Sequence, residues 1–277
     1  MIQAPDIGKM ILEHTSDSHL IELPFGVEIH LPGPWYIPGT QIDVSLTKHV
    51  VYMMFAAVLV FLTIWYAGRQ VEKRHREGKG PRGFGAAVEA MVLFVRDDVA
   101  IANIGHGGEK FVPLIETLFF FILYCNLLGL LPWGATPTGN LAVTGGLALI
   151  AFHVIEIAGF RTLGPKGYLK TIVMVPAGMT GVGAVAMAVI MTPVELIAKI
   201  VKPFALCLRL FANMTAGHFV ILSLLGLIFL FANWFIAAGT VAFVLFMMCL
   251  ELLVAFLQAY IFALLTSVFI GLMQHEH

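Results

Sequence analysis

Charged residues are scarce in this sequence. Only 12% of its 277 residues are charged, whereas 59% are hydrophobic and the mean hydropathy is +0.91. A typical soluble domain has about 25% charged residues, so the composition excludes an ordinary soluble fold and indicates a polytopic membrane protein. The net charge of −1 gives no support to nucleic-acid binding.

Cysteines and catalytic motifs are also scarce. The three cysteines, Cys125, Cys207 and Cys249, lie in apolar runs, which predicts buried small hydrophobic residues and no disulfide. The sequence has no GxSxG and no HExxH, which disfavours an intramembrane enzyme, and we expect neither a metal nor a cofactor. Its two halves share no motif, whereas a secondary transporter would show internal repeats. No basic start followed by an apolar core precedes residue 45, so no signal peptide is predicted.

Apolar runs divide the chain into two parts. Residues 1–47 are acidic and rich in turn residues, which predicts an extramembrane tail with little helix. Residues 48–277 form the predicted membrane domain. Three runs in it are each long enough to cross the ~30 Å hydrocarbon core, and they are Val50–Ala67, Phe111–Leu131 and Leu141–Phe160.

Basic residues follow the first and third of these runs, between Arg69 and Arg82 and between Arg161 and Lys170. Cytoplasmic loops carry the excess of Lys and Arg in membrane proteins. We therefore expect the N-terminus outside the cytoplasm and the C-terminus in the cytoplasm.

Phe84–Ala102 differs from the predicted spans because it is amphipathic. Its polar residues Glu89, Arg96 and Asn103 recur every seven positions, on the face opposite to the apolar residues Phe84, Val88, Met91, Val95 and Val99. This pattern predicts an interfacial helix that lies along the membrane.

The last two apolar segments are too long for simple spans. Met179–Phe231 as one helix would measure about 80 Å, more than twice the thickness of the hydrocarbon core. Two vertical spans would need an outside loop near Lys199, against the charge rule, so we expect one strongly tilted helix. Phe235–Met273 is its return leg. The predicted fold is an all-α polytopic membrane protein with five transmembrane spans, one interfacial helix and a long tilted two-helix hairpin at the C-terminal end.

Polar residues line one face of the first helix of this hairpin. They recur at steps of three or four positions, at Glu195, Lys199, Lys202, Leu206, Arg209 and Asn213, with Leu206 the one apolar member. An arginine at mid-bilayer costs from about 2.5 to well above 10 kcal/mol. We therefore expect a function to depend on Arg209.

The hairpin also predicts which polar residues lie level. With the turn near Asn233, Arg209 lies level with Gln258, and His218 lies level with Glu251 but closer to the turn by about 10–14 Å. His218 is also about half a turn around the helix from Arg209. This layout suits two half-channels that do not meet more than one continuous pore.

These motifs resemble subunit a of F-type ATP synthases, the stator channel beside the rotor ring. The resemblance covers roughly residues 45–273, and the lead-in Met179-Thr-Gly-Val-Gly183 is less typical. It rests on Pro203-Phe-Ala-Leu-Cys-Leu-Arg-Leu-Phe-Ala-Asn-Met-Thr-Ala-Gly-His218, on Thr192-Pro-Val-Glu-Leu196, on Leu257-Gln-Ala-Tyr-Ile-Phe262 and on Asn126-Leu-Leu-Gly-Leu-Leu-Pro132.

The resemblance implies a non-catalytic, proton-translocating subunit with two aqueous half-channels. It implies an inlet at His218 and Glu251, an outlet at Glu195, and an Arg209 that faces the rotor carboxylates, with Asn213, Gln258 and Asn126 also on the proton path. The implied partners are the rotor ring of c subunits, the peripheral-stalk b subunits, the rest of the ATP synthase and the lipid bilayer. Both H⁺ and Na⁺ stay open as the coupling ion, because the coordinating carboxylate lies on the rotor.

A structural role is the alternative for each polar group. No acid of this chain is clearly level with Arg209, which favours a counter-charge on another subunit. Arg209 could instead be satisfied by backbone carbonyls or by Glu251, and His218 could form a static pair with Glu251. Glu195 could form an i,i+4 surface pair with Lys199. His153 and Glu156 could form either a proton relay or a structural pair.

Overall fold

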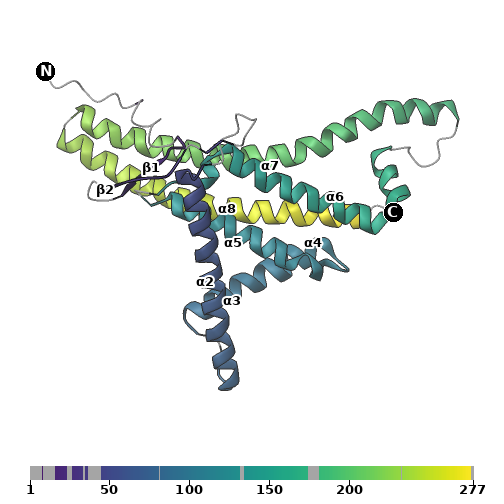
Figure 1. Cartoon of the computed structure of the whole chain (residues 1–277), viewed down its shortest axis with the longest axis horizontal. Helices are drawn as coiled ribbons and strands as arrows, with labels where there is room; N and C mark the ends of the chain where they lie inside the picture. The colour runs from purple at the N-terminus through teal and green to yellow at the C-terminus, as the bar shows by residue number, and fades with distance from the viewer. Residues whose placement is uncertain are drawn as a thin grey trace.

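The structure is a computed structural model of the whole chain (Figure 1). It describes residues 8, 16–23, 27–33, 35–36, 45–80, 82–131, 134–173, 181–231 and 233–275. Pro132 and the Met179–Thr180 part of the glycine-rich lead-in lie outside these residues. Within them, five helices are long and apolar enough to cross a membrane, as predicted. These five are α2 (Lys48–Arg76), α5 (Val112–Gly129), α6 (Leu141–Ile172), α7 (Val182–Phe231) and α8 (Trp234–His275).

The N-terminal segment contains a β-hairpin that the sequence analysis did not predict. Strands β1 (Leu20–Leu23) and β2 (Val27–His30) are antiparallel, and Leu20 pairs with His30. The segment is attached to the start of α2, where the backbone N–H of Lys48 donates to the carbonyl of Ser18 at 2.9 Å. In Figure 1 this hairpin lies near the first turn of α2, at the end opposite to its basic last turn.

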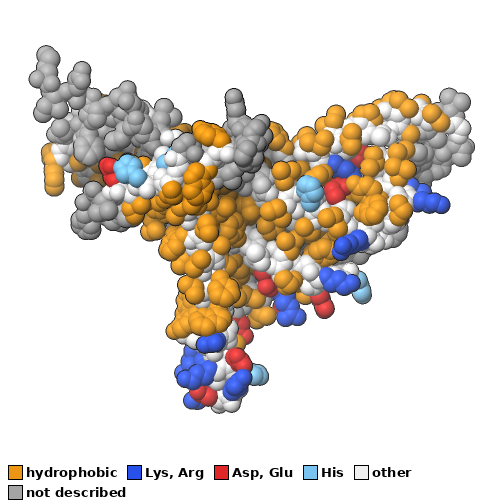
Figure 2. Space-filling view, in the orientation of Figure 1, with side chains coloured by type: hydrophobic (Ala, Val, Ile, Leu, Met, Phe, Trp, Pro, Cys, Tyr) orange, Lys and Arg blue, Asp and Glu red, His pale blue; other side chains and the backbone are white. Residues whose placement is uncertain are grey.

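Helix α2 is a largely exposed span. Its 29 residues rise about 44 Å, and large apolar side chains such as Phe55, Phe61 and Trp65 are exposed along it. Figure 2 shows this apolar surface ending in a tip of acidic and basic side chains. The last turn carries Lys73, Arg74, His75 and Arg76. These basic residues, predicted to follow the span in a loop, thus lie on the end of the helix.

The helix predicted over Phe84–Ala102 is present as one continuous helical segment, and its position along the membrane stays a prediction. It consists of α3 (Phe84–Phe94), the π-helical η1 (Val95–Ile101) and the short α4 (Ala102–Ile104). Val88, Val95 and Val99 are buried and Arg96 is exposed, which confirms the predicted faces. Phe84 is the exception, because it lies on the predicted inner face but is exposed.

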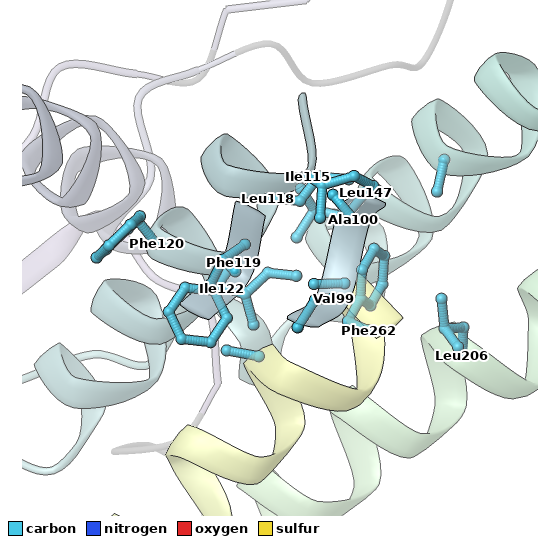
Figure 3. Close-up of a cluster of buried hydrophobic side chains, with 14 of the residues drawn as sticks. Val99, Ala100, Ile115, Leu118, Phe119, Phe120, Ile122, Leu147, Leu206 and Phe262 are labelled. Carbon is cyan, nitrogen blue, oxygen red and sulfur yellow. The ribbon is translucent and has the colours of Figure 1, made fainter. Parts of the chain in front are cut away.

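The core lies where α5 and η1 meet α6, α7 and α8 (Figure 3). Phe119 and Ile122 of α5 are fully buried, and Phe119 makes an edge-to-face contact with Phe256 of α8 at 5.7 Å between ring centroids. Lipid tails are as apolar as these side chains, so the close fit between them, rather than exclusion of water, favours association of the helices. Val99, Leu147, Leu206 and Phe262 complete the shared cluster.

Helix α7 is a single helix of 50 residues, about 75 Å long, although it contains Pro193 and Pro203. Helix α8 returns beside it over 42 residues. Figure 1 shows α2 running at a steep angle to α7 and α8, which lie alongside each other. The long two-helix hairpin predicted from the sequence is therefore confirmed. Because α7 is about 2.5 times as long as the ~30 Å hydrocarbon core is thick, we infer that it is tilted.

Helix α6 differs from the predicted span, which was expected to end at Phe160. It continues to Ile172 across a kink at Gly164, whose φ of 68° lies in the left-handed region and precedes Pro165. A proline disfavours helical backbone in the residue before it, and glycine tolerates the left-handed conformation. The kink brings the last turns of α6 back toward its earlier part.

The predicted burial of the cysteines is right for two of the three. All three are free thiols; Cys125 and Cys207 are buried, whereas Cys249 is exposed on α8, so the prediction was wrong for Cys249.

Contact between α8 and the interfacial segment depends on a missing side chain at Gly271. A Cβ at this position would lie 2.1 Å from the carbonyl oxygen of Asn103, whereas a Cβ at Gly239 of the same helix would meet nothing within 4 Å.

We therefore predict that Gly271→Ala destabilises the fold by about 1–3 kcal/mol, as overpacking does. Gly239→Ala is the matched control and should be neutral or stabilising, since alanine is the better helix former. Equilibrium unfolding of the purified protein in detergent–SDS mixtures measures both, and equal stabilities would show that the close packing at Gly271 is unimportant.

Candidate functional site

Arg209 lies on the exposed side of α7. Leu206 and Leu210 beside it are buried, whereas Arg209 itself is exposed together with the apolar Phe204 and Leu208. In the part of the chain that the structure describes, no carboxylate oxygen lies within 4.0 Å of its guanidinium nitrogens. Within these residues Arg209 therefore forms no ion pair with an acid of its own chain, and the absence of an acid at its depth stays a prediction.

Gln258 lies level with Arg209, as predicted from the turn. Its side chain is 4% exposed, and its Nε2 donates to the backbone carbonyl of Arg209 at 3.3 Å. The bond joins α8 to α7 at the depth of the arginine. Asn213, one turn further along α7, is exposed as Arg209 is.

His218 and Glu251 form the second polar site. His218 Nδ1 lies 3.3 Å from Glu251 Oε1, and the two side chains are 18% and 6% exposed. Glycine at position 217 permits this approach, because a Cβ there would lie 2.7 Å from Glu251 Oε1. The predicted level pair is therefore present, about 13 Å along α7 from Arg209.

The turn between α5 and α6 adds a threonine to this pair. Thr136 precedes the 3₁₀ helix η3 (Pro137–Gly139), and its hydroxyl lies 3.4 Å from His218 Nε2. Both ring nitrogens of His218 thus have polar neighbours, while Glu251 Oε2 is buried without a hydrogen-bond partner in the described residues. An unpaired buried carboxylate oxygen is costly unless water reaches it.

Two cavities meet at His218. One of about 220 Å³ is lined by His218, Thr136, Thr215 and His49 among others, and one of about 130 Å³ is lined by His218 and Glu251 with mainly apolar side chains. Each cavity is larger than the ~10–15 Å³ that is needed to hold one water molecule. The pair is therefore placed between two spaces that can hold water.

Asn126 has a bonding pattern of its own. Its side chain is fully buried; Nδ2 donates to the carbonyl of Ala255 at 3.2 Å, and Oδ1 accepts from Thr138 Oγ1 at 2.6 Å. These bonds join α5, η3 and α8. A part in the proton path stays a prediction, because both polar groups of the amide already have partners.

Glu195 lies at the other end of the polar line, about 21 Å along α7 from Arg209. It lines a cavity of about 60 Å³ together with Glu156, Lys199 and Lys202. The alternative of a surface pair between Glu195 and Lys199 is wrong. Lys199 is 9% exposed, and its ion-pair partner is Glu156, at 3.5 Å.

Glu156 is held by the folded-back end of α6. The Tyr168 hydroxyl donates to its Oε2, and Lys199 lies over the Tyr168 ring with Nζ 4.6 Å from the centroid. Lys199 also donates to Thr171 Oγ1 at 3.3 Å. His153 binds the carbonyl of Leu149 instead, so the structure supports a structural role for Glu156 and shows no direct His153–Glu156 pair.

Four of the seven predicted residues are therefore brought together in two level pairs on α7 and α8, while Asn213, Glu195 and Asn126 belong to neither pair. Thr136, Thr138 and the Glu156–Lys199 pair were missed. The signal for the threonines was available, since they occupy a turn next to the buried Asn126 motif. No comparable signal existed for Lys199, because its partner lies 43 residues away across a kink. No group of three or more His, Cys, Asp or Glu side chains in the described ranges is placed to hold a metal ion.

Comparison with known proteins identifies the family. The family model described as ATP synthase A chain matches residues 50–271. ATP synthase subunit a of Chloroherpeton thalassium is 48% identical over 96% of this chain and 77% of its own length, and that of Myxococcus xanthus is 48% identical over 87% and 78%. ATP synthase subunit a 2 of Chlorobaculum tepidum is 44% identical over 96% and 72%. The chain therefore belongs to the ATP synthase subunit a family.

Proposed function

We propose that this chain provides two separate aqueous half-channels that lead protons to and from the rotor-ring carboxylates, and so couples ion flow to rotation and ATP synthesis. As a member of its family it is a component of the ATP synthase complex and a multi-pass protein of the bacterial plasma membrane. Residues 48–277 form its membrane domain in this proposal, and residues 1–47 form a periplasmic segment.

The observation that carries the proposal is the contrast between Arg209 and His218 on one helix. The Arg209 side chain is exposed with no carboxylate of the described chain within ion-pair distance, while His218 is half-buried against Glu251 and two cavities. A charge that is unpaired at membrane depth needs a counter-charge from another subunit. The carboxylate of a c subunit supplies it.

Arg209 acts in this scheme as the barrier between the half-channels. Two aqueous paths to one rotor site invite a leak, because water that joined them would let protons cross without rotation. A fixed cation opposes a passing proton by like-charge repulsion and favours the ionised rotor carboxylate. The guanidinium stays charged when desolvated and offers five donors, whereas a lysine ammonium can lose its proton.

The inlet is the His218–Glu251 pair. A neutral imidazole and a carboxylate exchange protons readily near neutral pH, and water in the adjoining cavities supplies the link that Glu251 Oε2 lacks within the protein. The outlet passes Glu195 and the cavity that it shares with Lys202. Asn213, Gln258 and Asn126 orient groups along these paths.

The surface around Arg209 supports contact with the rotor. Besides Phe204 and Leu208, the exposed apolar side chains of α7 include Ile200 and Val201. A long slanted helix with such a surface fits the flank of a round, apolar ring of c subunits. Contacts with peripheral-stalk b subunits and with the rest of the complex follow from the family resemblance, and the chain itself carries no catalytic step.

The barrier role predicts a specific phenotype for Arg209. We expect Arg209→Ala to abolish coupled ATP synthesis and to make the membrane sector passively permeable to protons, and Arg209→Lys not to restore synthesis. Vesicles bearing the complex, with an imposed proton gradient and a pH-sensitive dye, measure both quantities. Val241→Ala, at an exposed apolar position of α8, is the control and should remain coupled. Parental synthesis without added leak in the Arg209→Ala vesicles would show that the barrier role is wrong.

The inlet pair predicts a rescue by exchange. Either His218→Ala or Glu251→Ala should slow proton-driven synthesis by roughly tenfold or more, as expected for the loss of a proton donor. Exchanging the two residues between α7 and α8 should restore part of the rate, because the 3.3 Å pair is re-formed with its members reversed. The exposed Val220→Ala is the control. Normal rates in both single variants would reduce the pair to a structural contact.

The basic turn at the end of α2 predicts the orientation. With Lys73, Arg74 and Arg76 on the cytoplasmic side, an odd number of spans places the C-terminus in the cytoplasm and the N-terminus in the periplasm. A C-terminal fusion to a reporter that is active only in the cytoplasm should be active, and the same fusion to a periplasm-specific reporter should be silent. The opposite pattern contradicts this orientation.

A further inference from the structure

A buried histidine outside the predicted site faces the same cavity as His218. His49 lies in the first turn of α2 and is 4% exposed. Its Nδ1 lies 2.9 Å from Asp17 Oδ1, in the N-terminal segment. The imidazole and the carboxylate therefore lie at ion-pair distance.

Asp17 is fixed in place from two elements besides the His49 ring. Its Oδ1 lies 3.4 Å from the backbone nitrogen of His49, which donates to it, and its Oδ2 accepts from Asn140 Nδ2 at 3.2 Å. Asn140 in turn caps α6, since its Oδ1 accepts from the backbone N–H of Ala142 at 2.8 Å. The N-terminal segment is thereby attached to the outer ends of α2 and α6.

The charge state of Asp17 supports this arrangement. Partial burial alone would raise the pKa of its carboxyl, but the interactions with His49 and a hydrogen bond with Thr47 together outweigh burial and lower that pKa below the usual value. Asp17 is therefore ionised at neutral pH. Its stabilising contact is present above the ordinary carboxyl pKa and is lost only as the pH falls through the lowered one.

The cavity of about 220 Å³ connects this pair to the inlet. His49 and Ser16 line it from the N-terminal side, and Thr136, Thr215 and His218 line it from the other elements. Thr215 Oγ1 is buried with no hydrogen-bond partner in the described protein, so a polar atom on the cavity wall is left for water. The cavity has room for several waters between the two histidines.

We propose that His49, held by Asp17, is the outer proton-loading group of the inlet, and that it passes protons through water in this cavity to His218. The inference rests on the proposed inlet at His218 and Glu251. Lys48, in the same turn of α2, is the other charged residue beside His49. Its side chain is buried, and Lys48 has an interaction partner of its own.

The proton balance is simple. The His49 ring accepts one proton from the periplasmic solvent and forms the imidazolium, and the Asp17 carboxylate, 2.9 Å from Nδ1, balances its charge. The imidazolium then releases one proton to a cavity water, which passes one to His218 and from there to Glu251. His49 returns to its neutral form, and no group other than a proton is transferred.

The test is proton-driven ATP synthesis by the complete complex in liposomes at low inlet-side buffer. We expect His49→Gln to slow the initial rate by roughly 3- to 10-fold, less than the about 10²–10⁴-fold of a proton donor without substitute, because water still reaches His218. Loading imidazole on the inlet side should restore most of the rate in His49→Gln, since a mobile base replaces the missing one. A merely structural defect would not respond to imidazole.

Three further variants make the result decisive. Asp17→Asn removes the negative charge beside the imidazolium, so it should also slow synthesis, and imidazole should restore the rate. If the His49→Gln complex does not assemble, Asp17→Asn tests the proposal in its place. His30→Gln, an exposed histidine of β2, is the matched control and should be unchanged. His218→Ala separates the two proposals: slow synthesis in His218→Ala with parental rates in His49→Gln and Asp17→Asn would overturn this inference alone. Parental rates in all three would overturn the inlet as well.

Discussion

Lipid offers no hydrogen bonds, and this one constraint explains where the polar residues of the chain lie. Every polar side chain at membrane depth must find a partner in the protein, in water or in another subunit. Asn126 finds two partners within the fold, and Lys199 finds Glu156, Thr171 and the Tyr168 ring. His218 and Glu251 find each other and adjoin cavities that can hold water. Arg209 has no acidic partner among the described residues, which is why a carboxylate of a neighbouring subunit is the natural completion of the site.

The long hairpin of α7 and α8 sets the distances between the polar groups of the site. On a helix of 1.5 Å per residue, three polar groups separated by 14 and 9 residues lie far apart along the axis, and the nine-residue step also turns the side chain to the opposite side. Glu195 and His218 therefore adjoin separate cavities, while Arg209 lies between them on a third, exposed surface. A steeper, shorter helix would have brought these groups closer together, and the separation of inlet from outlet would have been lost.

Contacts outside the hairpin hold the inlet pair in position. Gly217 lets Glu251 approach α7, and Thr136 brings the turn between α5 and α6 against His218. Asp17 and Asn140 attach the N-terminal segment to the outer ends of α2 and α6. The proposed inlet thus draws on five separate parts of the chain, although His218 and Glu251 lie on one hairpin.

The sequence by itself determined the features that depend on periodicity and counting along one helix or one hairpin. Apolar length identified the five spans, amphipathic spacing identified α3 with η1, and the turn near Asn233 correctly made Arg209 level with Gln258 and His218 level with Glu251. Only the tertiary structure decided the contacts between distant segments. Packing of α6 against α7 placed Lys199 beside Glu156, and the kink at Gly164 brought Tyr168 and Thr171 to the same lysine. The cavity beside His218 is also lined by His49. Such pairings depend on how helices cross and where loops return, which no local pattern of side chains encodes.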